Sequence, residues 1–222
     1  AFPSHALARR FNWKLKQLAL SPSDFLLYHD TCYTAEFLKA YDEEEMVVFD
    51  TETTGLDVFA DDIIEIAAMK IKAGEIVGEP LDLYIKTDKP ILPKLGDKDN
   101  PMYAIYHEKL SAEELITPQE ALQRFLAYIG TRPILGHNAN YDYNIIDNCL
   151  QRYCNDTLKA HMNPCFDSLK LIRLLSPSLH SYKLESLLET FQLTGKNSHQ
   201  AIDDVGATVS LVRLCAEKAR EK

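Results

Sequence analysis

The apolar and polar positions that follow residue 45 predict three successive strands. Residues 46–51, an apolar run that leads into Asp50 and Thr51, are expected to form the first strand. Residues 61–73 alternate loosely between apolar and polar side chains, and Gly74-Glu75 turns this segment into a further run over 76–87. Short connections between consecutive strands favour antiparallel pairing, so we expect a meander.

The rest of the chain predicts strands that alternate with helices. Thr117-Pro118-Gln119-Glu120 combines an N-cap threonine with proline at the first helical position and glutamate at the third. Short apolar strands are expected at 133–136 and 165–167, and the segment 86–101, rich in proline, lysine and aspartate, is expected to be a loop. Further helices are expected at about 141–153, 168–175 with Ser168 as its cap, 183–191 and 200–217. This order predicts an α/β fold, a mixed sheet with helices on its faces.

The segment ahead of the first strand predicts a helical N-terminal extension over residues 1–45, followed by one domain over 46–222. Residues 5–19 form an amphipathic pattern with a basic face, which serves either for packing or for contact with nucleic acid or a partner. Residues 23–45 are interpreted as short helical pieces that end in an acidic run.

Composition limits the class of protein. A chain of 222 residues with 46% hydrophobic residues suffices for one domain with its own core. The net charge of −9 argues against a large, sequence-reading DNA interface, although an enzyme that holds a few phosphates through metal ions remains compatible with it. Five scattered cysteines without a Cys-x-x-Cys pair, no visible secretory leader and apolar runs too short for a bilayer favour a reducing cytoplasm and no membrane partner.

Candidate chemistry begins at the end of the first strand. Side chains alternate between the two faces of a strand, so Asp50 and Glu52 lie on the same face, close together. Two like charges at short range repel, and either a proton or a cation relieves that repulsion. A strand that simply runs out into a polar loop is the alternative interpretation.

Two further carboxylates are expected at the same edge of the sheet. Asp142 starts a helix directly after a strand, and Asp204 lies in the first turn of the last helix, shortly after His199. Sites in sheet-and-helix folds gather at strand ends. Adjacent helical residues point about 100° apart, so only one of Asp203 and Asp204 is expected to face inward.

These motifs resemble those of the DEDDh-type (DnaQ-like) 3′–5′ exonucleases, the family of the proofreading epsilon subunit of bacterial DNA polymerase III. The segment 48–56, Val-Phe-Asp-Thr-Glu-Thr-Thr-Gly-Leu, is similar to the first family motif, and 137–142, His-Asn-Ala-Asn-Tyr-Asp, to the second. His199 followed five residues later by Asp204 is similar to the third. The resemblance covers residues 46–217 and implies a ribonuclease H-like fold with a mixed five-stranded sheet flanked by helices.

The resemblance implies a metal-dependent reaction. Asp50, Glu52, Asp142 and Asp204 would hold two divalent ions, and oxygen-only ligands favour Mg²⁺ or Mn²⁺. His199, with an ordinary pKa of about 6.5, would be the general base. The expected activity is release of nucleoside monophosphates from the 3′ end of single-stranded or frayed DNA, in proofreading or repair, with a DNA polymerase as a partner. An exoribonuclease and a non-catalytic accessory subunit are the alternatives.

The resemblance also implies substrate contacts, each with an alternative. Thr51 and Thr53 would contact the end nucleotide, and Leu56 either wedges against the terminal base or is a core leucine. Asn138 either contacts substrate or caps the following helix. The stretch 105–111 conforms poorly to the family, so the expected contact is His107 or, in its place, the neighbouring tyrosine. Two further side chains are expected to be structural, His137 in the second motif and Asp167 as a helix cap.

Overall fold

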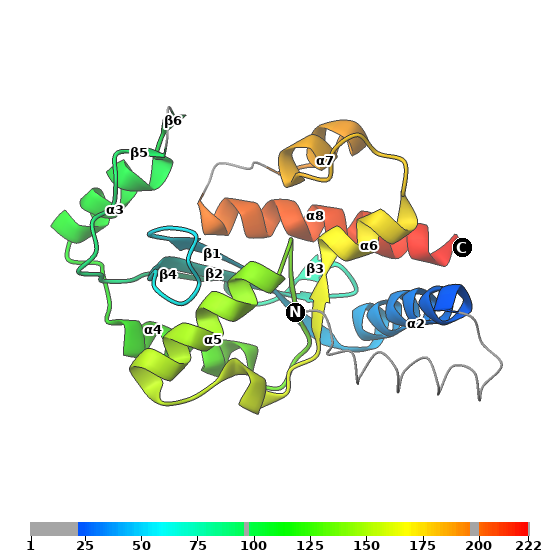
Figure 1. The fold of residues 1–222 in the computed structure, drawn as a ribbon, viewed down its shortest axis with the longest axis horizontal. Helices are drawn as coiled ribbons and strands as arrows, with labels where there is room; N and C mark the ends of the chain where they lie inside the picture. Colours follow the sequence, from blue (N-terminus) through cyan, green and yellow to red (C-terminus); the bar gives the residue numbers. More distant parts are fainter. Residues whose placement is uncertain (1–21, 96–97, 196–199, 222) are drawn as a thin grey trace.

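The computed structural model describes residues 22–95, 98–195 and 200–221 (Figure 1). The basic helix expected at 5–19 and the expected general base His199 both lie outside the described residues. The expected division of the chain at residue 45 stays a prediction.

A mixed sheet is the centre of the fold, as the sequence pattern predicts, but it has six strands and not the expected five. The path β3-β2-β1-β7-β8 runs across it, and β4 also pairs with β2. The first strand in the chain, β1, is antiparallel to β2 and parallel to β7, which in turn is parallel to β8. The bounds are β1 Glu45–Thr53, β2 Ile63–Lys72, β3 Glu75–Ile76, β4 Leu81–Tyr84, β7 Ile134–Gly136 and β8 Cys165–Asp167.

The sixth strand arises because the run expected at 76–87 is interrupted. Its first part is β3, which pairs with the end of β2, and its second part is β4, which pairs with β2 over 65–68. Gly78 between them has φ of 72°, which only glycine adopts readily, and Pro80 donates no ladder hydrogen bond. These two residues separate the run into two strands.

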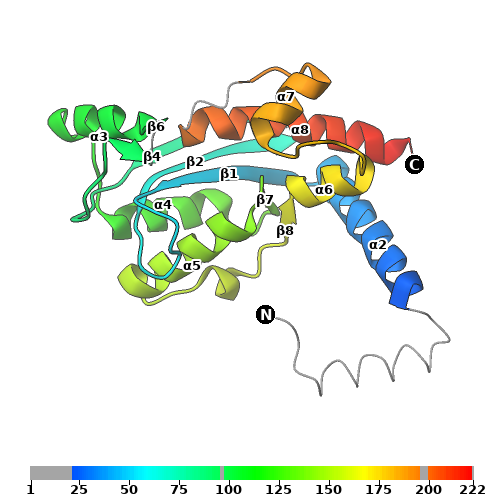
Figure 2. The ribbon, with the colours of Figure 1, turned by 45° about the horizontal axis from the view of Figure 1, so that its top comes forward.

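Helices cover both faces of the sheet (Figure 2). One face packs against α4 and α5, and the other against α8, with α6, α7 and the later part of α2 in the same core cluster. Side chains of β1 alternate between the two clusters, so that Met46 and Val48 join the α8 side and Val47 and Phe49 the α5 side. The bounds are α2 Pro22–Glu43, α3 Pro101–Ser111, α4 Pro118–Ile129, α5 Asn140–Cys154, a short 3₁₀ helix η1 Leu158–His161, α6 Ser168–Leu175, α7 Leu184–Phe191 and α8 Ala201–Arg220.

The helices expected after residue 117 start within one residue of the observed positions, and the capping residue differs at α6. Thr117 caps α4 by accepting a hydrogen bond from the backbone N–H of Glu120. The cap of α6 is Asp167, whose side chain accepts from the N–H of Leu169, and Ser168 is the first helical residue. Asp167 is therefore a helix cap, as expected, and takes the place that the sequence pattern assigned to Ser168.

Three segments differ from the expected secondary structure. Where several short helical pieces are expected over 23–45, residues 22–43 form one continuous helix, α2, and Glu45 already belongs to β1. The expected loop 86–101 contains a small hairpin of β5 Lys94–Leu95 and β6 Lys98–Asp99. The helix α3 was not predicted, although Asn100, whose side chain accepts from the N–H of Met102, and Pro101 form an N-terminal signal. In the described part of the chain, no helix is both long and apolar enough to cross a membrane.

The later half of α2 is part of the core. Phe37 is fully buried in the cluster that also contains residues of β1, α6 and α8, and its ring packs edge-on against Phe166 of β8. The hydroxyl of Tyr33 accepts a 2.7 Å hydrogen bond from the backbone N–H of Asp167 at the edge strand. Residues 33–43 therefore stabilise the sheet edge that leads into α6.

Replacing the buried ring of α2 should destabilise the whole domain. We expect Phe37→Ala to lower the free energy of unfolding by about 3–5 kcal/mol, because a large core side chain leaves a cavity. Urea denaturation followed by circular dichroism measures this change. Lys39→Ala, on the exposed side of the same helix, should stay within about 0.5 kcal/mol of the unaltered protein. A loss below about 1 kcal/mol for Phe37→Ala would show that α2 is not a structural part of the domain.

Candidate active site

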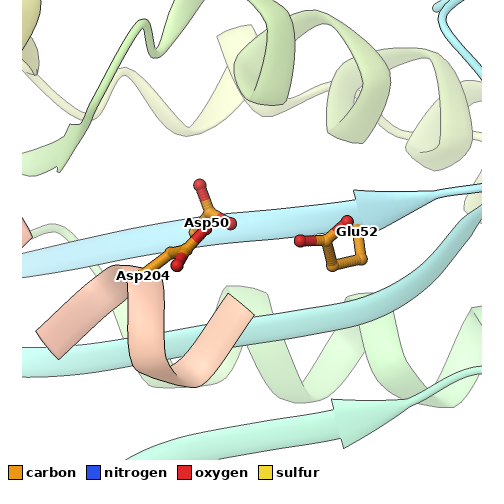
Figure 3. A group of neighbouring side chains, drawn as sticks. All are labelled: Asp50, Glu52 and Asp204. Atoms are coloured by element: carbon orange, nitrogen blue, oxygen red, sulfur yellow. The ribbon is translucent and has the colours of Figure 1, made fainter. Parts of the chain in front are cut away.

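Three carboxylates from two elements converge on one face of the sheet. Asp50 and Glu52 lie at the end of β1, and Asp204 comes from the first turn of α8 (Figure 3). One oxygen of each lies within 4.8 Å of one oxygen of each of the others. The structure thus brings together three of the four carboxylates that the sequence predicts to meet, and we call these three the acidic cluster.

The alternation of β1 explains why these side chains meet. Asp50 and Glu52 continue the row of Met46 and Val48, which faces α8, so they point toward the start of that helix. Asp204 is buried there, whereas Asp203 is half-buried and lines a separate surface groove with residues of β2, β3 and the outer side of α8. Only one of the two adjacent aspartates faces inward, as expected.

The fourth expected carboxylate, Asp142, lies beside the acidic cluster rather than in it. It is in the first turn of α5, on the opposite face of the sheet, and is 5% exposed. Its Oδ1 accepts hydrogen bonds from the backbone N–H of Thr51 at 3.1 Å and from the hydroxyl of Thr51 at 2.6 Å. Thr51, which is expected to contact substrate, is thus buried and fixes Asp142 to β1.

Glu65 is a further carboxylate beside the acidic cluster, and the sequence pattern did not predict it. It lies directly opposite Glu52 in the β1–β2 ladder and is fully buried. Its Oε1 accepts a hydrogen bond of 3.4 Å from the backbone N–H of Ile202, in the first turn of α8. A carboxylate near the start of a helix is favourable, so Glu65 ties the helix that carries Asp204 to β2. A lone glutamate within the otherwise apolar run 63–68 was the signal.

The carboxyl groups are shifted strongly toward their protonated forms. Burial raises the pKa of Glu52 to about 8, and neighbouring carboxylates, Glu65 first among them, add to the shift. The pKa of Asp50 lies well above its usual range, because of burial and then of the negative charge of Asp142. Burial raises the pKa of Asp142 to about 6, against the lowering effect of the hydrogen bond from Thr51.

These residues fit a divalent cation. No lysine or arginine that the structure describes forms an ion pair with Asp50 or Glu52. Oxygen-only ligands at this spacing suit hard divalent ions. Like charges held this close repel, and protons or a bound cation relieve that repulsion.

The glycine turn after β1 presents an exposed leucine. Thr53 and Tyr141 have hydroxyl oxygens 2.8 Å apart, and each also lies within hydrogen-bond distance of the carbonyl oxygen of Gly55. Asp61 accepts from the N–H of Asp57 and closes the loop. Leu56 is 89% exposed, so the core-leucine alternative is wrong. A contact of Thr53 or Leu56 with substrate stays a prediction.

The second motif, residues 137–142, lies beside the acidic cluster. The ring nitrogens of His137 contact the hydroxyl of Ser168 at 2.9 Å and the carbonyl oxygen of Tyr182 at 3.1 Å, and burial lowers its pKa. His137 is therefore structural, as expected. Asn138 has φ of 64°, and its N–H donates to Asp167. The N-cap of α5 is Ala139, so Asn138 is not the cap, and it lines the cavity next to Asp50.

The expected contact in the stretch 105–111 lies on α3. His107 is exposed, stacks on Tyr103 and contacts that residue's carbonyl oxygen through Nδ1. Tyr106, the alternative, is buried, and its hydroxyl accepts from the N–H of Thr87. Neither residue belongs to the acidic cluster or to the cavity beside it, so a substrate contact of His107 stays a prediction.

The fold and the acidic cluster define the class of protein. The central strand of the mixed sheet ends in two carboxylates, and helices on both faces bring further carboxylates to it, as the resemblance to DnaQ-like 3′–5′ exonucleases predicts. Residues 47–212 match the family model described as RNase_T: Exonuclease. The chain therefore belongs to the exonuclease family, as the three motifs predict.

Similar proteins agree with this family. "DNA polymerase III PolC-type" of Clostridium perfringens is 31% identical over 180 residues, which cover 81% of this chain, and its Thermotoga maritima counterpart is 34% identical over 171 residues, which cover 77%. This chain spans 12% of the length of each. Escherichia coli Exonuclease I in complex with a dT13 oligonucleotide has the same fold, with a TM-score of 0.65 and 22% identity over 80% of this chain and 42% of that one.

The raised pKa of Glu52 should make stability depend on pH when divalent ions are removed. Because the folded-state value of about 8 lies above the ordinary 4.5, the folded protein binds this proton more tightly than the unfolded chain. The contribution of Glu52 to the free energy of unfolding is therefore fully present below pH 4.5 and is lost as the pH rises through about 8. In EDTA, Glu52→Gln should become more stable relative to the unaltered protein as the pH rises from 4.5 to about 8. Urea denaturation at each pH measures the difference.

Asp203→Asn is the matched control, because Asp203 lies outside the acidic cluster. Its stability difference from the unaltered protein should stay constant over the same range. A constant difference for Glu52→Gln as well would contradict the raised pKa.

Proposed function

We propose that this chain is a 3′–5′ exonuclease that releases nucleoside monophosphates from the 3′ end of single-stranded or frayed DNA, in replication or repair. The observation that carries the proposal is the convergence of Asp50, Glu52 and Asp204 within 4.8 Å. A pure binding module has no need of buried, converging carboxylates, which argues against a non-catalytic accessory subunit.

Asp50, Glu52 and Asp204, with Asp142 beside them, would hold two Mg²⁺ or Mn²⁺ ions against the scissile phosphate. Bound ions of this kind supply an activated water and stabilisation of the leaving 3′ oxygen. Thr51 fixes the orientation of Asp142 through two hydrogen bonds. Glu65 fixes the first turn of α8 and so the position of Asp204.

His199 is proposed as the general base. It lies five residues before Asp204, just ahead of α8, and an imidazole titrates near neutral pH. It would accept a proton from the attacking water, which four carboxylates engaged with metal ions do less well. The oxygen of that water forms the new bond to phosphorus, the bond to the 3′ oxygen breaks, and that oxygen takes up a proton.

DNA is the proposed substrate on the basis of the related proteins. The PolC-type relatives are named as DNA polymerases, and Escherichia coli Exonuclease I is described with dT13 and with single-stranded DNA. Leu56, which is 89% exposed, would contact the last base of the terminal nucleotide. A DNA polymerase is the proposed partner.

The test is degradation of a 5′-labelled single-stranded DNA in Mg²⁺, with RNA of the same sequence in parallel. We expect a ladder that shortens from the 3′ end, faster on DNA, and no reaction in EDTA. Asp204→Asn should lower kcat by about 1,000-fold, because metal ions contribute several kcal/mol to the transition state. His199→Ala should lower it by about 100-fold to 10,000-fold.

Asp203→Asn is again the control and should retain the rate of the unaltered protein. Full activity of Asp204→Asn would refute the proposed site. Faster degradation of the RNA would leave the chemistry in place and replace the proposed substrate.

A further inference from the structure

A cavity of about 580 Å³ extends the site away from the acidic cluster. Asp50 and Asp204 line it together with Asn138, α6 and the start of α7. Its volume lies within the roughly 300–1,000 Å³ typical of ligand sites. The acidic cluster therefore opens into this cavity. Of the residues that the sequence predicts to contact substrate, Asn138 alone lines it.

Two cations line this cavity, Arg173 on α6 and Lys183 just before α7. Both are exposed, and neither forms an ion pair with any residue that the structure describes. Glu185 also lines the cavity, so the wall outside the acidic cluster carries two cations against one carboxylate. In a chain with a net charge of −9, this is a local excess of positive charge beside a strongly acidic site.

The guanidinium group of Arg173 is held in place by the fold. It lies over the ring of Tyr182, with 5.3 Å between the guanidinium carbon and the ring centroid. The Tyr182 hydroxyl donates to the carbonyl of Ser176, and its own carbonyl accepts from His137 at the end of β7. Stacking on a fixed aromatic ring orients the guanidinium before any ligand binds.

A nucleic-acid strand in the site carries more than one phosphate. Divalent ions held by the acidic cluster would neutralise the scissile phosphodiester, but the phosphodiesters on its 5′ side need another counter-charge. Arginine and lysine supply most phosphate contacts of nucleic-acid-binding proteins. The cavity leads from the acidic cluster to two such residues that have no protein counter-ion among the described residues.

We propose that Arg173 and Lys183 bind the phosphodiesters that precede the scissile one, and so select a strand over an isolated nucleotide ester. This inference rests on the proposed exonuclease function and names the path of its substrate. The two cations are binding residues, because the reacting atoms lie at the acidic cluster.

Binding is measured by fluorescence anisotropy of 5′-fluorescein-labelled dT8, with Ca²⁺ in place of Mg²⁺ so that no hydrolysis occurs. We expect Arg173→Met and Lys183→Met each to weaken binding. Each should also reduce the slope of log affinity against log salt concentration by about 0.7, which corresponds to one phosphate of a single strand that the protein no longer neutralises. Arg173→Lys should restore the slope, because it restores the charge.

Lys39→Met and Arg124→Met are matched controls, since each removes one exposed cation outside the cavity. They should leave the slope unchanged. Slopes for Arg173→Met and Lys183→Met equal to those of the controls would overturn the inference.

A substrate with a single phosphate separates this inference from the proposed function. Thymidine 5′-monophosphate p-nitrophenyl ester has no phosphodiester on its 5′ side, so the unaltered protein and Arg173→Met should hydrolyse it at equal rates. On dT8, the KM of Arg173→Met should rise while kcat holds. An equal reduction of kcat/KM on both substrates would overturn the inference. If the unaltered protein hydrolyses neither, the proposed function fails, and the anisotropy slopes still decide whether these cations bind the strand.

Discussion

Repulsion among buried carboxylates is the interaction on which the rest of this structure depends. Asp50, Glu52 and Asp204 bring their oxygens within 4.8 Å of one another, and Asp142 and Glu65 add negative charge close by. Like charges at this spacing favour protonation in the absence of a cation. The same repulsion becomes an attraction for divalent ions, so the raised pKa values of Asp50 and Glu52 and the proposed catalysis have one origin.

The fold holds these groups together through packing and a few directed hydrogen bonds. β1 is buried on both faces, and its alternation sends Asp50 and Glu52 toward α8 and Thr51 toward α5. Thr51 then fixes Asp142, and Glu65 fixes the first turn of α8. The hydrophobic clusters on the two faces supply the stability that the converging charges reduce.

Local sequence patterns predicted those parts of the fold that depend on local chemistry. Strand and helix periodicity predicted which side chains of β1 face α8, the capped start of α4 and the inward orientation of only one of Asp203 and Asp204. The resemblance of the third motif to the family selected Asp204. The split of the run 76–87 and the continuity of α2 were missed, because tertiary pairing and packing decide them. The place of Glu65 depends on the β1–β2 register and on where α8 begins, neither of which a linear pattern specifies. The stacking of Arg173 on Tyr182 likewise depends on how the loop between α6 and α7 folds back.

The location of divalent ions in a crystal grown with Mn²⁺ is the decisive observation, because manganese is identified by its anomalous scattering. Peaks are expected within coordination distance of Asp50, Glu52 and Asp204, with a second ion beside the first on the side of Asp142. The peaks should be absent from crystals of Asp204→Asn grown in the same way. Well-ordered crystals of the unaltered protein in which manganese binds elsewhere, with the acidic cluster free of it, would contradict the assignment of this site as a metal centre.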